Sequence, residues 1–225
     1  MQAPALSRIL ALPPVRNEPS PTVPQQHNPV PISSEPRWRP TRQYTTATLP
    51  PACRHWLLDD SSLTLRLIEL NLGVFKVQRL YQGWQRPRLS ESALLDVPPQ
   101  QNALIREVGL MLSDKTVVFA RSVFPASSLV GDLAHLRYLQ NKSLGSILFS
   151  HPGMRRSPFE LALMPGDCAY LPPELQQETP AWGRRSRFVI GGRKLMVSEV
   201  FLQEFTPWTS ALPVHRARRG NTRQG

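Results

Sequence analysis

The sequence predicts an α+β fold in which an antiparallel β-sheet carries helices packed on one face. Two β-rich runs flank Gly191-Gly192, and a Gly-Gly pair between such runs is a strong signal for a two-residue hairpin. A second hairpin is predicted where strands 103–112 and 117–122 flank the turn 113–116. Because a hairpin pairs its strands antiparallel, and helical patterns precede both hairpins, we expect helices and sheet to form separate layers.

The other elements follow from local signals along the chain. Ser61-Ser62 offers helix-capping residues, after which Leu63, Leu67 and Leu70 share one helical face and Gly73 ends the helix. The remaining expected elements are strands at 74–82 and 159–163, a helix at 132–141, and a long proline-containing loop at 164–181.

The chain is predicted to have one folded domain between two appendages. Residues 1–51 hold twelve of the 24 prolines and no apolar periodicity, which predicts a disordered extension over 1–48. The folded domain is expected over 49–205. Residues 206–225, with four arginines and no acid, are expected to form a basic, flexible tail.

Charged residues lie on the apolar faces of three predicted strands. Arg106 shares its parity with Leu104 and Val108, and alternate residues of a strand share a face. Arg121 similarly shares parity with Val117 and Phe119, and Glu199 with Val197 and Phe201. Each residue alone is explained by a structural ion pair. Three together favour an internal cavity for a small charged ligand, because buried charges are costly unless they are paired.

Composition and missing motifs exclude several classes of function. The net charge of +11 is split between the two ends and the middle of the chain, so no continuous nucleic-acid surface is expected. No run is apolar and long enough for membrane insertion, and no secretory signal is recognised. The two cysteines, in no C-x-x-C pair, fit a reducing cytoplasm. No metal-ligand spacing and no nucleotide-binding motif is found, so neither metal nor cofactor is expected.

Six short motifs, in consistent order over residues 53–203, give the chain a family resemblance. They are WLLDDSSLT at 56–64, LIREV at 104–108, ARSVFP at 120–125, LGSILF at 144–149, WGRRSR at 182–187 and SEVFL at 198–202. The set resembles the chorismate pyruvate-lyase (chorismate lyase) family, and WGRRSR is the most specific part of it.

The resemblance implies a bacterial enzyme that converts chorismate to 4-hydroxybenzoate and pyruvate without a cofactor, for ubiquinone biosynthesis. By matching positions, Arg106 would hold the ring carboxylate and Glu199 the ring hydroxyl, and these two are the expected catalytic residues. Leu144 would line the pocket, as would Leu63, where well-known members of the family have Met. Arg121 is the candidate for the enolpyruvyl carboxylate. A monomer is expected.

The alternative from another functional class is a non-catalytic, ligand-sensing domain of the same fold. Such domains in transcription regulators work with a separate helix-turn-helix, which the proline-rich residues 1–51 do not supply. Arg185 and Arg187, on the parity opposite to Arg184, are expected outside the pocket, where they serve structure, solubility or substrate steering.

Overall fold

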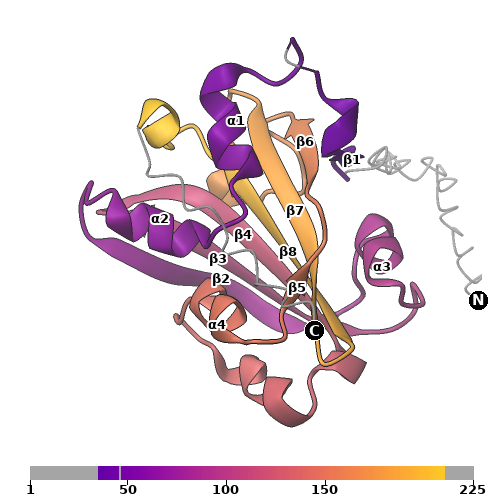
Figure 1. The fold of residues 1–225 in the computed structure, drawn as a ribbon. Helices are drawn as coiled ribbons and strands as arrows, with labels where there is room; N and C mark the ends of the chain where they lie inside the picture. Colours follow the sequence, from indigo (N-terminus) through magenta and orange to yellow (C-terminus); the bar gives the residue numbers. More distant parts are fainter. Residues whose placement is uncertain (1–34, 46, 211–225) are drawn as a thin grey trace, which may run out of the picture. The chain divides into compact units, whose positions relative to one another are not determined.

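The computed structural model describes residues 35–45 and 47–210, and within them the strands form one antiparallel sheet. The strand order is β1-β6-β7-β8-β4-β3-β2, and the short β5 pairs with β7 (Figure 1). The strands are β1 (Arg39–Pro40), β2 (Phe75–Gln85), β3 (Ala103–Leu112), β4 (Lys115–Pro125), β5 (Arg155–Arg156), β6 (Glu160–Met164), β7 (Ala181–Ile190) and β8 (Arg193–Phe201). The predicted α+β class is confirmed.

Four α-helices and several short 3-10 helices accompany the sheet in the described part of the chain. The α-helices are α1 (Pro51–Leu58), α2 (Leu63–Glu69), α3 (Leu89–Leu95) and α4 (Leu144–Ser150). The 3-10 helices are Thr41–Gln43, Ala126–Ser128, Gly131–Tyr138, Pro173–Leu175 and Pro207–Thr209. The helix expected at 132–141 is therefore a 3-10 helix, and α1, α3 and α4 were not predicted.

Both hairpins form where the sequence predicts them. Gly191 and Gly192 have φ angles of 54° and 77°, a left-handed backbone that glycine adopts without a Cβ clash. The turn leaves Ile190 opposite Arg193, so Arg184 lies opposite Glu199 as the register requires. The other hairpin turns tightly at Ser113-Asp114, which makes β4 longer than expected.

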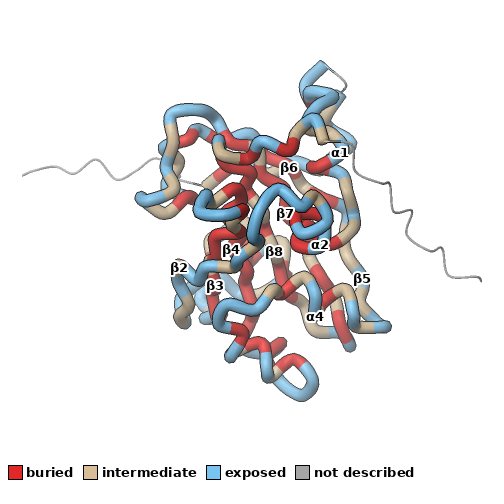
Figure 2. The backbone as a smooth tube through the Cα atoms, turned by 90° about the vertical axis from the view of Figure 1, so that its left-hand side faces the viewer, coloured by how far each residue is buried: buried red, intermediate tan, exposed pale blue. Residues whose placement is uncertain are grey.

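The sheet is covered on both faces. On one face, α1, α2 and α4 pack with the leucines of the 3-10 helix at 131–138 (Figure 1). On the other face, Leu95 of α3 packs on Ile105 and Met196, and the loop after β6 adds Tyr170. The expected single helical layer thus holds for α1, α2 and α4, while α3 lies opposite. Figure 2 shows the resulting burial of the central strands β4 and β8.

Packed residues lie on both sides of the predicted domain 49–205. Upstream, β1 pairs with β6, and the Tyr44 hydroxyl donates to the Leu161 carbonyl at 2.9 Å. Downstream, Trp56 Nε1 donates to the Pro207 carbonyl at 2.8 Å. The sequence did not indicate these contacts for two reasons. The high proline content suggested disorder, and a two-residue edge strand leaves no periodic pattern. The rest of the predicted extension and tail, 1–34 and 211–225, lies outside the described residues.

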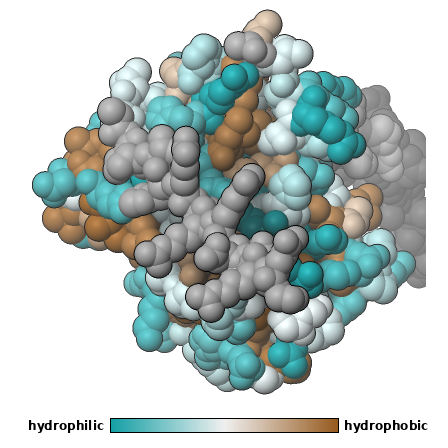
Figure 3. Space-filling view, in the orientation of Figure 1, coloured by the Kyte–Doolittle hydropathy of each residue, from teal (hydrophilic) through white to brown (hydrophobic). Residues whose placement is uncertain are grey.

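Helix α2 is apolar on its inner and its outer side. Leu63 and Leu67 are buried against the sheet, whereas Leu65 and Ile68 are about half exposed. Figure 3 shows hydrophobic surface in the region that α2 occupies in Figure 1. None of the described helices combines the length and the apolar character that crossing a bilayer requires.

Candidate active site

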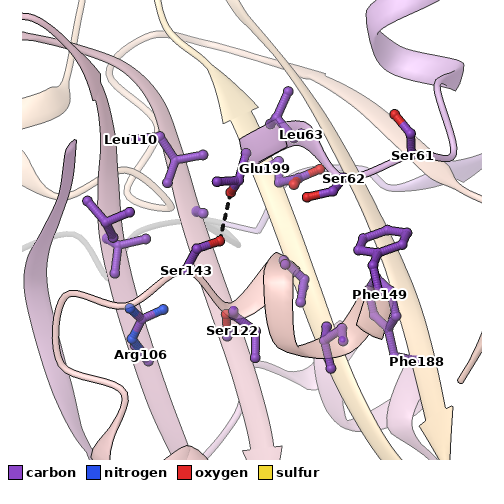
Figure 4. Close-up of a pocket in the computed structure, with 18 of the residues that line it drawn as sticks. Ser61, Ser62, Leu63, Arg106, Leu110, Ser122, Ser143, Phe149, Phe188 and Glu199 are labelled. Carbon is purple, nitrogen blue, oxygen red and sulfur yellow. Dashed lines mark hydrogen bonds between the residues drawn. The ribbon is translucent and has the colours of Figure 1, made fainter. Parts of the chain in front are cut away.

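A pocket lies between the sheet and the helices α2 and α4. Figure 4 shows its polar side chains: Arg106 from β3, Ser122 from β4 and Glu199 from β8 point into one space. Sheet register explains this, because Arg106, Ser122 and Val197 are successive cross-strand partners on β3, β4 and β8. Glu199 lies one same-face position further along β8, so it flanks the row that begins at Arg106.

Arg106 is buried and has no carboxylate partner among the described residues. Its side chain lines the pocket, and the residue is 2% exposed. One guanidinium nitrogen, Nη2, donates to the carbonyls of Gln140 and Lys142, both at 2.8 Å, while Nε has no hydrogen-bond partner. Burial, and to a lesser degree the charge of Arg79, lowers the pKa of Arg106 to about 10. Both effects penalise a cation that lacks an anion, so the site favours an anionic ligand.

Glu199 is held in place by a buried arginine. Arg184 Nε donates to Glu199 Oε2 at 2.6 Å, and Arg184 Nη1 donates to the carbonyls of Trp56 and Asp59. Arg184 therefore ties the carboxylate of β8 to the end of α1 and orients it. With Oε2 occupied, Oε1 is the oxygen that can accept a hydrogen bond from a ligand hydroxyl.

The helical side of the pocket contains the two predicted leucines. Leu63 stands at the start of α2 and Leu144 at the start of α4, and both line the pocket. Ser62 caps α2 by accepting from the Leu65 amide. The Ser143 hydroxyl donates to Thr64 Oγ1 at 2.9 Å, the contact drawn in Figure 4. This hydrogen bond joins the beginnings of the two helices over the sheet.

Arg121 does not join the pocket and lies on the opposite face of the sheet. It donates to both oxygens of Glu91 at 2.8 and 3.0 Å and to Glu107 at 2.6 Å. The prediction for this residue fails because the central strand β4 is buried on both faces. Phe119 and Arg121 share one face while Ala120 and Ser122 line the pocket, so an apolar parity could not identify the ligand side.

Arg185 and Arg187 are outside the pocket, as predicted. Arg185 is nevertheless 5% exposed, donating to Glu160 at 2.7 Å and to Ser90 at 2.8 Å. Arg187 donates to the Leu94 carbonyl, so both arginines serve the packing of α3. The described part of the chain contains no cluster of three or more His, Cys, Asp or Glu side chains suited to a metal ion.

One charged lining residue was missed: Arg156, on β5. No element was predicted at residues 155–156, because a two-residue strand is too short to show parity. Its Nε donates to Ser186 Oγ at 2.7 Å and Nη1 to the Asp60 carbonyl at 3.2 Å. The guanidinium also lies 4.0 Å from the ring centre of Phe159. A signal that could have found it is the position of Arg156 three residues before Phe159, the aromatic residue that its guanidinium contacts.

Together these side chains form an apolar pocket with arginines on β3 and β5 and one oriented carboxylate between them. Such a site can hold a small ring that carries carboxylates and a hydroxyl. It can also stabilise negative charge that develops on a departing group.

Comparison with known proteins gives the family. The family model described as chorismate lyase matches residues 33–210. A relative named "Probable chorismate pyruvate-lyase" from Pseudomonas aeruginosa strain UCBPP-PA14 is 44% identical over 156 residues, covering 69% of this chain and 86% of the relative. One of the same name from Alcanivorax borkumensis is 39% identical over 165 residues, covering 73% of this chain and 74% of its own length.

Among solved structures, similar chains include the effector domain of PhnF from Mycobacterium smegmatis, with a TM-score of 0.47 and 14% identity. That match covers 64% of this chain and 89% of the other. The similarity is too low to bear on function. The family model, which spans most of the chain, and relatives at about 40% identity do bear on it. On this evidence the chain belongs to the chorismate lyase family.

Proposed function

We propose that this protein is a chorismate pyruvate-lyase, which converts chorismate to 4-hydroxybenzoate and pyruvate. The observation that carries the proposal is Arg106, a buried cation without an ion pair among the described residues, in the same pocket as the oriented carboxylate of Glu199. A ring with a carboxylate at one end and a hydroxyl at the other matches this pair. Family membership supports the same substrate.

Arg106 binds the ring carboxylate, and Glu199 accepts the hydrogen bond of the ring hydroxyl. Guanidinium and carboxylate match in plane, which fixes the orientation of the ring. Leu63 and Leu144 cover the ring from α2 and α4 and keep water away. These contacts also suit 4-hydroxybenzoate, which keeps the carboxylate and the hydroxyl of the substrate.

The chemistry is an elimination that aromatises the ring. The bond between ring carbon 3 and the ether oxygen breaks, and its electron pair leaves with the enolpyruvate oxygen. The proton on ring carbon 4 is lost, its electron pair forms the new ring double bond, and a proton reaches the enolpyruvate methylene to give pyruvate. Aromaticity supplies the driving force, so the protein orients the substrate and stabilises the leaving anion. No cofactor is required.

The surroundings of the reaction are also proposed. Cys53 and Cys168 are not joined by a disulfide, in agreement with a reducing cytoplasm. The active unit is proposed to be a monomer. The anions it recognises are small carboxylates, and neither nucleic acid nor a membrane is a partner.

The test is turnover in the presence of a chelator. Purified protein with chorismate and EDTA should release 4-hydroxybenzoate and pyruvate in equal amounts. Glu199→Gln keeps the shape but removes the charge, and should lower the rate roughly tenfold or more. Glu174→Gln, an exposed acid outside the pocket, is the control and should behave as the parent. Absence of turnover, or turnover that depends on added metal, would contradict the proposal.

A further inference from the structure

The pocket contains a second arginine, and the product needs only one. Arg156 and Arg106 line the same pocket from β5 and β3, with β4, β8 and β7 between them. At about 4.8 Å per strand, their backbones are about 19 Å apart, and both long side chains reach into the space between. 4-Hydroxybenzoate carries a single carboxylate, which Arg106 satisfies. The role of Arg156 is therefore still to be explained.

Arg156 lacks an anionic partner among the described residues. It contacts the Ser186 hydroxyl, the Asp60 carbonyl and the faces of Phe159 and Phe188, and none of these groups is a carboxylate. Those contacts fix the guanidinium plane, and Nη2 makes no hydrogen bond within the described part of the chain. Burial and the nearby charge of Arg184 lower its pKa to about 9, and the more weakly acting charges of Glu199, Asp60 and Asp59 do not offset these two effects.

The register places Glu199 and Arg156 on opposite sides of the row that begins at Arg106. Ser186, the anchor of Arg156, is the cross-strand partner of Val197 in the row that begins at Arg106. Glu199 flanks this row on one side. The partner of Arg156 on β7 is Phe188, which flanks it on the other side. The substrate has a similar arrangement. When its ring carboxylate lies at Arg106, the hydroxyl at ring carbon 4 and the ether at ring carbon 3 point away in two different directions, one towards each side of the row.

We infer that Arg156 binds the carboxylate of the enolpyruvyl group, the second carboxylate of the substrate and the one that departs with pyruvate. This inference rests on the proposed function and assigns to Arg156 the contact that the family resemblance suggested for Arg121. Because the group leaves with its carboxylate, Arg156 acts on the substrate and on departing pyruvate but makes no contact with 4-hydroxybenzoate.

The consequence is a separation between two ligand classes. Two stable aromatic probes differ only in the second carboxylate: 3-(carboxymethoxy)-4-hydroxybenzoate and 3-methoxy-4-hydroxybenzoate. The parent should bind the dicarboxylate more tightly. Arg156→Gln should reduce this preference tenfold or more, as expected for a lost charge-assisted contact, while the affinity for the methoxy compound changes less than threefold. Arg106→Gln should weaken both compounds to a similar degree.

Calorimetric titration of the parent and of the variants measures these affinities. The matched control is Arg155→Gln, the exposed neighbour on β5, which should leave both affinities unchanged. Arg156→Lys keeps the charge but loses the paired N–H donors of the planar guanidinium, so it should retain part of the preference for the dicarboxylate. It also serves if the glutamine variant does not fold, since its aliphatic stem can still cover the phenylalanine rings.

Kinetics give a second readout that a purely structural role would not move. Arg156→Gln should raise the KM for chorismate while inhibition by 4-hydroxybenzoate stays as in the parent. Equal weakening of both probes, or a parent without preference for the dicarboxylate, would overturn the inference. If the parent shows the preference through Arg156 but does not turn over chorismate, the proposed function fails and the second anion site stands. If chorismate is turned over but Arg156 has no effect on the preference, the inference fails and the proposed function stands.

Discussion

The two faces of the sheet differ in how completely their arginines are paired with acids. On the pocket face, the buried Arg106 and the partly exposed Arg156 have no salt bridge among the described residues, whereas the buried Arg184 is paired with Glu199. On the other face, Arg121 and Arg185 are as buried as Arg106, but Glu91, Glu107 and Glu160 neutralise them. Burial alone therefore does not identify a binding residue. The absence of a neighbouring carboxylate identifies it, because a buried cation without an anion has a free-energy cost that a bound ligand can offset.

The largest effect is expected on the paired face. Arg121→Met leaves the fully buried Glu91 without its cation, and removing one partner of a buried ion pair costs about 3–5 kcal/mol in free energy of unfolding. Denaturant unfolding measures this loss. The affinity of the folded fraction for 4-hydroxybenzoate should stay at the parent value. A weakened affinity without loss of stability would show that Arg121 belongs to the ligand-binding site.

The same pair predicts an acid limit to stability. Burial raises the pKa of the Glu91 carboxyl, but the hydrogen bonds and charge of Arg121 outweigh it, and the pKa lies below its ordinary value. A depressed carboxyl pKa stabilises the fold above the pKa of the unfolded chain, about 4.3, and this stabilisation is lost as the pH falls through the folded pKa. Unfolding measured from pH 7 to 3 should show the loss. The Glu91→Gln variant should have a lower free energy of unfolding than the parent at pH 7, and it should lack this part of the pH dependence.

Substitution of Arg106 on the pocket face is not expected to destabilise the fold, in contrast to substitution of Arg121. Arg106→Gln removes an uncompensated buried charge, so the free energy of unfolding should stay the same or rise. The affinity for 4-hydroxybenzoate should fall by about 1.5–3 kcal/mol, the contribution of a hydrogen bond to a charged group. Calorimetry measures the affinity and thermal unfolding measures the stability, so together they test whether the two quantities change in the expected directions. A marked loss of stability would show that Arg106 is structural.

The smallest effect concerns the edge of the paired face. A chain that begins at residue 46 lacks β1 and Trp38, whose ring lies 4.8 Å from the Arg185 guanidinium and packs edge-on against Tyr170. Compared with a chain that begins at residue 33, it should lose about 2 kcal/mol, or about 4–8 °C in Tm. Its turnover rate should be retained, because none of residues 35–45 lines the pocket. An unchanged Tm would restore the predicted boundary at residue 49.

The sequence predicts the parts of this molecule whose patterns are long. Strands β3, β7 and β8 and their hairpins follow from alternation and from one Gly-Gly pair, and Arg106 and Glu199 follow from parity along those strands. Two-residue strands carry no alternation, so β1 and β5 were missed, and Arg156 with them. Arg121 was misplaced for a different reason. In a strand buried on both faces, hydrophobicity no longer distinguishes the two sides, and only the positions of Glu91 and Glu107 in three dimensions decide.

The double burial of β4 also has a consequence for redesign. Ala120 and Ser122 form part of the pocket floor, whereas their neighbours Phe119 and Arg121 serve the opposite face. Alternate positions of one strand can therefore be varied independently. Enlarging Ala120 or removing the Ser122 hydroxyl would reshape the space for the ring while the residues that hold the fold together stay untouched. This single strand is thus the place where ring selectivity can be altered with the least disturbance to the scaffold.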